Sequence, residues 1–318
     1  MQKTIISSNQ FAIVQTIFPV AILAAIFLMI CAPAHTQELG AVLRSDMGLK
    51  SGTQMAPGYY FTMPLYYNAD YSSVRGPNGN ALPGQVSTEL NLIIPVITVT
   101  TKWKLLGGYY GFKVAEPFSN QALASTFVPV HKGNNYGFGD LYVVPIIMGW
   151  HTKRLDYLAD FGFHAPTGVG IRSLDMWTYE LAFGTTYYLD EGKKWSASGN
   201  GTLEIHSVKN NTDILVGDFV TIKGGVGRSF LKGAATVGLV YSLQYKITHD
   251  GGTDLPALLP NTLNRAHALG AEADFPVFVK EKKKLAAFIG ARYAWEFLNR
   301  SNFQGNNLAL TLTVAKFD

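Results

Sequence analysis

The chain has 318 residues, of which only 15% are charged and 13% are aromatic, and it contains 32 glycines. That charged fraction is well below the quarter expected of a soluble globular domain, and the composition excludes a disordered chain, a coiled coil and a collagen-like rod. The net charge of +4 gives no reason to expect nucleic acid as a partner.

The first 34 residues have the pattern of a secretory signal peptide. Lys3 precedes an apolar stretch over 17–30, which is followed by the Ala-x-Ala pattern Ala32-Pro33-Ala34. We therefore expect export and cleavage after Ala34, with an uncleaved anchor helix as the alternative. Cleavage would remove Cys31, the single cysteine, so the mature chain would have no disulfide and no thiolate metal site.

Residues 35–58 have no alternating pattern and contain the turn-forming pair Pro57-Gly58. They are too short for a separate domain. We expect this segment to lie at the periplasmic mouth of the domain that follows, or to fold into its lumen.

The remainder of the chain, 59–318, alternates apolar and polar residues with a period of two. From Leu285 to Phe297 the odd positions are apolar, whereas the even ones include Arg292 and Glu296. The segment 235–247 repeats the pattern, with Lys246 on its polar side. Because side chains of a strand alternate between two faces, each such segment has one apolar and one polar face.

These segments are long, and short and long connections alternate between them. The clearest have 11 to 13 residues, whereas strands of soluble proteins are usually about half that, and a tilted strand crossing a membrane needs ~9–11. Twelve segments are predicted, at 59–71, 86–100, 102–115, 137–150, 154–166, 176–190, 194–209, 215–229, 232–249, 264–280, 284–299 and 305–317.

An even number of long antiparallel strands with tight turns at one end is typical of a bacterial outer-membrane protein. We therefore predict an all-β fold, a transmembrane antiparallel up-and-down β-barrel of about twelve strands in the bacterial outer membrane. The alternative is a soluble β-sandwich or shell with its apolar faces inward, because alternation alone does not distinguish inside from outside.

Several motifs resemble one family, over about 85–317. They are Gly137-Phe138-Gly139-Asp140-Leu141-Tyr142, Gly149-Trp150-His151, Ala165-Pro166-Thr167-Gly168, Trp177-Thr178-Tyr179-Glu180 and Gly238-Leu239-Val240-Tyr241. The sequence resembles the outer-membrane family named for the MetA-pathway of phenol degradation, also called SphA-like. The resemblance implies a passive, porin-like transporter for small hydrophobic or aromatic solutes, associated with catabolism of aromatic compounds. The resemblance implies no catalytic residues for this sequence.

The polar faces supply the candidate site residues. If the apolar faces meet outer-membrane lipid, the polar faces line the lumen. The lumen-lining residues expected to contact solute are Asp156, Asp160, His164, Glu180, Glu204, Lys246, Arg292 and Glu296. These charges either brace the barrel through cross-strand pairs or select the solute. The excess of acidic groups predicts an interior that disfavours anions.

Two other functions stay open. Ser198, His164 and His206 are residue types that an outer-membrane barrel enzyme acting on lipids would need, but no motif groups them. The second alternative function is that of a closed structural or adhesive barrel. We expect no enzyme activity, no cofactor and no metal, because no characteristic ligand spacing is present.

The last strand departs from the usual outer-membrane pattern. Leu308, Leu310, Leu312 and Val314 set its apolar phase, and Phe317 lies out of that phase. The final aromatic residue is therefore out of phase with the apolar side, unless a bulge near Lys316 restores the phase.

Overall fold

The computed structural model describes residues 39–318 except 83–85, 126–131, 134–135 and 256–261. The predicted signal peptide, 1–34, lies outside the described residues. No helix in the described part of the chain is both long and apolar enough to span a membrane. The strands are β1 (Gly58–Arg75), β2 (Val86–Leu105), β3 (Gly108–Ala115), β4 (Phe118–Ser125), β5 (Lys132–Gly133), β6 (Gly137–Phe138), β7 (Leu141–His151), β8 (Leu155–Ala165), β9 (Thr178–Tyr188), β10 (Trp195–His206), β11 (Phe219–Phe230), β12 (Ala235–Lys246), β13 (Arg265–Lys280), β14 (Leu285–Arg300) and β15 (Asn302–Phe317).

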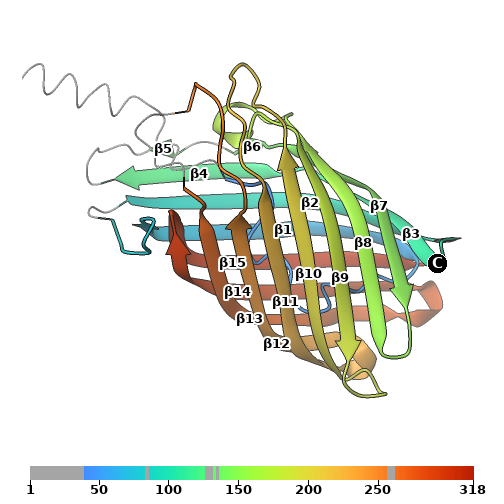
Figure 1. The fold of residues 1–318 in the computed structure, drawn as a ribbon. Coiled ribbons are helices and arrows are strands. Elements are labelled where there is room, and N and C mark those ends of the chain that lie inside the picture. The colour runs from blue at the N-terminus through green and yellow to red at the C-terminus, as the bar shows by residue number, and fades with distance from the viewer. Residues whose placement is uncertain (1–38, 83–85, 126–131, 134–135, 256–261) are drawn as a thin grey trace, which may run out of the picture. The chain divides into compact units, whose positions relative to one another are not determined.

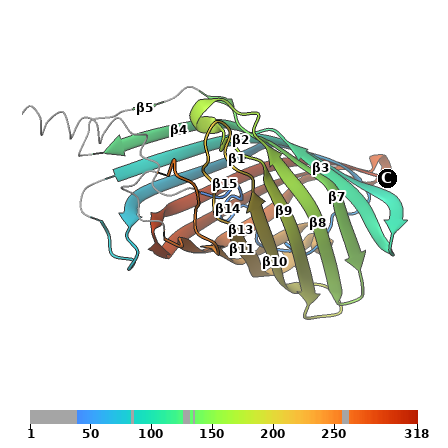
Figure 2. The same ribbon diagram turned by 45° about the horizontal axis from the view of Figure 1, so that its top comes forward.

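Twelve of these strands form a closed antiparallel barrel, as predicted. β1 pairs with both β15 and β2, and the remaining ladder runs from β2 through β3 and β7 to β15 in chain order. Figures 1 and 2 show the ring of strands from two directions. Because the ring closes, no barrel strand leaves its backbone groups unpaired along an open edge.

The long strand β2 connects the barrel to a small extension of the sheet. Its second half pairs with β3, whereas its first half pairs with β4. β4 in turn pairs with the short strands β5 and β6. The stretch 116–136 was expected to be a loop, so this extension is an addition to the predicted fold.

Two connections differ from the sequence prediction. The predicted segments 86–100 and 102–115 place a turn at about Thr101, whereas the turn lies at Leu106-Gly107, where φ is 49° and 81°. Two consecutive residues with positive φ form the tight hairpin turn whose twist matches that of the paired strands. The connection expected at 300–304 is shorter, because only Ser301 separates β14 from β15.

The connections define two ends of the barrel. At the short-turn end lie the brief links 106–107, 152–154, 189–194, 231–234 and 281–284, together with the start of β1 and the end of β15. The longer connections, described over 76–82, 166–177, 207–218, 247–255 and 262–264, lie at the opposite, long-loop end.

The outer surface of most strands is apolar. Leu181 and Phe183 of β9 are 53% and 58% exposed, and Leu239 of β12 is 65% exposed. Their neighbours along the same strands, such as Glu180 and Ser242, are buried. The apolar faces therefore point outward and the polar faces inward, which is the reverse of a soluble shell.

The C-terminal aromatic residue points to the inside. The Phe317 ring packs edge-on against Tyr60 at a centroid distance of 6.0 Å, and Tyr60 is buried. Leu310, Leu312 and Val314 are exposed on the outer face. The out-of-phase position predicted for Phe317 is thus confirmed.

Candidate functional site: the lumen and the segment inside it

The chain preceding β1 lies within the barrel. Residues 39–57, which we call the inner segment, contact inward-facing groups on nine strands. Only a segment inside the barrel can contact all nine. In Figure 1 this segment is the blue trace that passes among the strands. The strands that bond to it are β1, β7, β8, β9, β10, β11, β12, β13 and β14.

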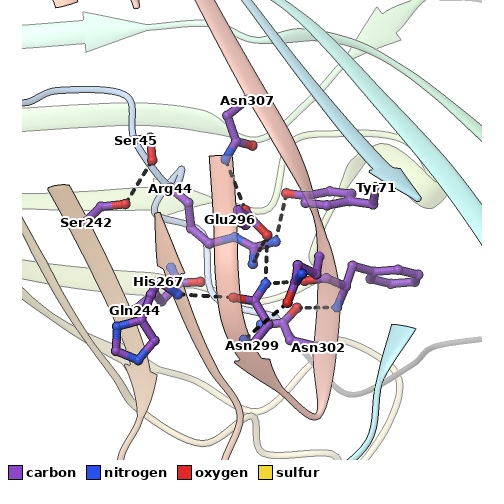
Figure 3. A network of polar contacts seen from close by, with 12 residues as sticks. Arg44, Ser45, Tyr71, Ser242, Gln244, His267, Glu296, Asn299, Asn302 and Asn307 are labelled. Carbon is purple, nitrogen blue, oxygen red and sulfur yellow. Dashed lines mark hydrogen bonds and ion pairs between the residues drawn. The ribbon is translucent and has the colours of Figure 1, made fainter. Parts of the chain in front are cut away.

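Arg44 forms the centre of a buried polar network (Figure 3). Its Nη1 lies 3.3 Å from Oε2 of Glu296 on β14, and its Nη2 donates to the Tyr71 hydroxyl at 2.7 Å. Asn299 and Asn307 also donate to the Glu296 carboxylate, at 2.7 and 3.0 Å. Glu296 is fully buried, so its carboxylate has lost contact with water. The hydrogen bonds from Arg44, Asn299 and Asn307 replace that hydration.

Two further carboxylates accept hydrogen bonds from backbone N–H groups of the inner segment. Oε2 of Glu204 accepts from Ala41 at 2.7 Å and from Val42 at 3.2 Å. Oε2 of Glu272 accepts from Leu49 at 2.9 Å. These N–H groups lie in a segment without secondary structure, and the carboxylates supply the acceptors that buried backbone requires.

Towards the short-turn end, the inner segment is held by another set of polar groups. Asp46 pairs with Lys223 on β11. The Thr53 hydroxyl donates to Asp156 at 3.1 Å, and the Tyr188 hydroxyl donates to the same oxygen at 2.7 Å. The segment is therefore attached to the wall along its whole described length.

The eight predicted site residues all lie on the inner face, but they form separate groups. His164 Nε2 lies 2.8 Å from Glu180, and the His164 ring stacks on Tyr142 at 4.2 Å. Lys246 pairs with Asp250 at 2.5 Å.

On β13 and β14, Arg292 pairs with Glu272 at 2.7 Å and not with Glu296, four residues along the same strand. Asp160 is half-buried on β8, between Asp156 and His164 on the same face. Most of these charges thus form cross-strand pairs or bind the inner segment, which agrees with the bracing interpretation.

The sequence analysis missed the partners that the inner segment supplies. Arg44 and Asp46 lie in a stretch with no periodicity, so no pattern assigned them a face. Lys223 lies next to Gly224-Gly225, where alternation is weak. One feature of the sequence nevertheless indicates a partner inside the barrel. Arg44 and Asp46 are charged residues close to turn-forming residues, in a segment that is too short to fold on its own.

One sector of the inner face is apolar. The inner apolar patch lies on β1, β2, β3 and β15 and packs against Leu43 of the inner segment. It consists of Tyr67, Ala69, Tyr71, Leu92, Ile94, Ala115 and Ala309.

The outer surface of the same sector is polar. Asn68 donates to Glu89 at 3.0 Å and to Asn91 at 2.9 Å, and the Tyr66 hydroxyl donates to Asn91 at 2.7 Å. Both faces of this wall therefore have the opposite polarity to those of β9–β12.

The geometry gives no support to hydrolytic chemistry at Ser198. Its hydroxyl donates to the carbonyl oxygen of Gly48 at 2.9 Å. His206 lies on the same strand eight residues away, about 26 Å along it, and its Nδ1 contacts Thr178 at 2.9 Å. Among the described residues, no group of three or more His, Cys, Asp or Glu side chains is arranged to hold a metal ion.

Comparisons with known proteins agree with the barrel. The family model described as "Putative MetA-pathway of phenol degradation" matches residues 72–312. An outer membrane channel of Pseudomonas putida F1 has 12% identity and a TM-score of 0.71, covering 85% of this chain and 99% of that one. At this identity the likeness concerns the fold alone.

Two other solved structures are less similar. The β domain of the Bordetella autotransporter BrkA has 12% identity and a TM-score of 0.43, covering 83% of this chain and 100% of that one. The outer membrane channel DcaP of Acinetobacter baumannii has 10% identity and a TM-score of 0.33, covering 85% and 99%. Both likenesses are too weak to support an argument. A comparison with curated proteins returned no sequence match.

Proposed function

Because the chain belongs to the family of the putative MetA-pathway of phenol degradation, we propose that it is an outer-membrane channel for passive uptake of small hydrophobic or aromatic solutes. In this proposal, residues 1–34 direct export and are removed. The apolar outer faces contact lipid, and the barrel conducts solute without catalysis or a cofactor.

The inner apolar patch is the observation that carries the proposed solute class. A barrel that conducts only ions or sugars has no need of Leu92 and Ile94 on its inner face, since burying them there gains contact only with other apolar groups. Aromatic solutes are small enough to lie against such a surface and gain from the same contact.

The inner segment controls access to this patch in the proposed mechanism. Leu43 packs on the patch, and Arg44 is bonded to the hydroxyl of Tyr71, which belongs to the patch. A solute reaches these side chains only when that part of the segment moves. Flux through the intact barrel is therefore expected to be low, and flux after removal of 39–56 to be high.

A flux assay in liposomes tests the proposal. The refolded chain and a variant lacking 39–56 are reconstituted, and entry of phenol is compared with entry of a sugar of similar size. We expect phenol to enter faster than the sugar, and both to enter faster through the shortened variant. If neither protein passes either solute, the channel proposal is wrong and the filled lumen favours a closed structural barrel.

A further inference from the structure

Three cations gather on the outer surface of the barrel at the short-turn end. Lys194 and Lys232 come from two neighbouring turns and Arg228 from the end of β11 between them, and all three are exposed. The Ser229 N–H donates to the Lys194 carbonyl at 2.7 Å, which joins the turns.

Two aromatic rings hold the central cation of this group. The Arg228 guanidinium carbon lies 5.4 Å from the centroid of the Trp195 ring and 5.1 Å from that of Phe230. The rings are 46% and 43% exposed on the same outer face. A guanidinium held between such rings keeps its hydrogen-bond donors in a fixed direction, which suits it to bind a phosphate at a membrane surface.

A hollow lies on the same strands, further from the turns. Gly199 and Gly201 of β10 face outward, and a Cβ built on either has nothing within 4 Å. The hollow has a volume of about 270 Å³. It is lined by Leu181, Ala182, Phe183, Gly201, Thr202, Leu203 and Val220.

The distance between the cations and the hollow matches the length of a membrane lipid from its headgroup to the end of its acyl chain. Gly201 follows Trp195 by six residues, which is about 20 Å along a strand. At a tilt of ~45° this is about 14 Å in depth, close to the middle of a hydrocarbon layer ~30 Å thick. A phosphate at Arg228 would thus place an acyl chain along β10, with its end in the hollow.

The surrounding charge favours an anionic headgroup. Besides these three cations, the short-turn end carries further exposed cations: Lys102, Lys104, Lys153, Arg154, Lys280, Lys282, Lys283, Lys284 and Lys316. Its exposed acidic residues are fewer, namely Glu191, Glu281 and Asp318, while Asp190 is half-buried and Asp156 is buried. The end as a whole is therefore positive.

We propose that Lys194, Arg228 and Lys232, with Trp195 and Phe230 beneath them, bind the phosphate of an anionic phospholipid whose acyl chain occupies the Gly199–Gly201 hollow. The lipid belongs to the leaflet facing the short-turn end. This site rests on the proposed membrane location, but it does not depend on solute flux.

Native mass spectrometry of the full chain, reconstituted in mixed phosphatidylcholine and phosphatidylglycerol, tests the site. Protein released from the bilayer should retain phosphatidylglycerol in preference to phosphatidylcholine. The double variant K194Q/R228Q should lower that preference by roughly fivefold per charge removed. The matched control K282Q/K283Q removes the same charge on the β13–β14 turn, away from the Trp195 and Phe230 rings, and should lower the preference much less.

A variant of the hollow separates chain binding from headgroup binding. Gly201→Leu fills the hollow without a clash, and it should reduce retention of both lipids while keeping their ratio. Equal loss in the two double variants would overturn the proposal in favour of diffuse attraction, and no loss in K194Q/R228Q would also overturn it. Lipid retention without solute flux would leave this site standing and contradict the channel alone, whereas failure to insert into bilayers would contradict both.

Discussion

The walls formed by β9–β12 and by β1–β2 place opposite chemistry on their two surfaces. In β9–β12 the outer face carries Phe183 and Leu239 and the inner face carries Glu180 and Glu204. In β1–β2 the inner face carries apolar side chains such as Leu92, and the outer face carries amides and carboxylates.

Position along the barrel explains this difference. Near the short-turn end, β1 still exposes Tyr59 and Phe61 on its outer face, and the polar outer residues begin only at Asn68. Beyond that level β2 pairs with β4, outside the ring of twelve strands. This part of the wall therefore has the surface of a region in contact with water. The polarity of each face matches the surroundings that this face contacts. The alternating pattern alone does not determine which face is inside.

The largest expected effect comes from the polar interior. Glu296→Ala would leave Arg44 buried without its carboxylate, and we expect a loss of about 3–5 kcal/mol of unfolding free energy. Urea unfolding in lipid vesicles measures it. Glu281→Ala removes an exposed carboxylate from a turn and is the control, with no measurable change expected. Similar stability of both variants would contradict a structural role for the Arg44–Glu296 pair.

A charge placed on each outer wall tests the comparison directly. Leu239→Arg puts a cation at the middle of β12 on the apolar outer face, with an expected cost of about 2–4 kcal/mol. Asn68→Arg puts the same cation on the polar outer face of β1, where it should cost at most ~1 kcal/mol. Equal costs in unfolding experiments would mean that the two outer walls meet the same surroundings.

The inner wall of β1–β2 can be tested by solute flux. Leu92→Ser should slow phenol entry roughly tenfold, because about 1.5 kcal/mol of apolar contact is lost. Leu181→Ser, which changes an outer-face leucine, is the matched control and should leave the flux unchanged. Flux is measured per folded protein, so that a loss of stability is not mistaken for a loss of transport. An unchanged rate in Leu92→Ser would exclude the inner apolar patch from the solute path.

The smallest expected effect concerns the loops above β10–β13. The Thr253 hydroxyl and N–H and the Asp254 N–H donate to Asp213, and these bonds lower the pKa of its carboxyl to about 2. The folded pKa lies below the ordinary value of 3.8, so the contact is at full strength above that value and is lost as pH falls through about 2. Protection of the amides at 253–254, measured relative to their intrinsic exchange rates, should fall over that interval. In Asp213→Asn the protection should be low at every pH, and a pH-dependent protection persisting in that variant would assign it to another group.

The sequence predicted the wall of the barrel much better than its contents. Long alternating strands such as 235–247 determined the strand count and which residues share a face, since period-two patterns are local. The Arg44–Glu296 pair is not local, and nothing near Arg44 encodes its partner. The β1–β2 reversal was also hidden, because 59–71 is rich in aromatic residues on both faces and its alternation has no clear sign.

The bonds of the inner segment also constrain the order of assembly. Arg44 and Glu296 are separated by 252 residues, and the segment binds both early and late strands. Its full set of partners exists only after β15 has paired with β1. We therefore expect the inner segment to order late in folding, because contacts between residues so distant in the sequence carry a large loop-closure cost.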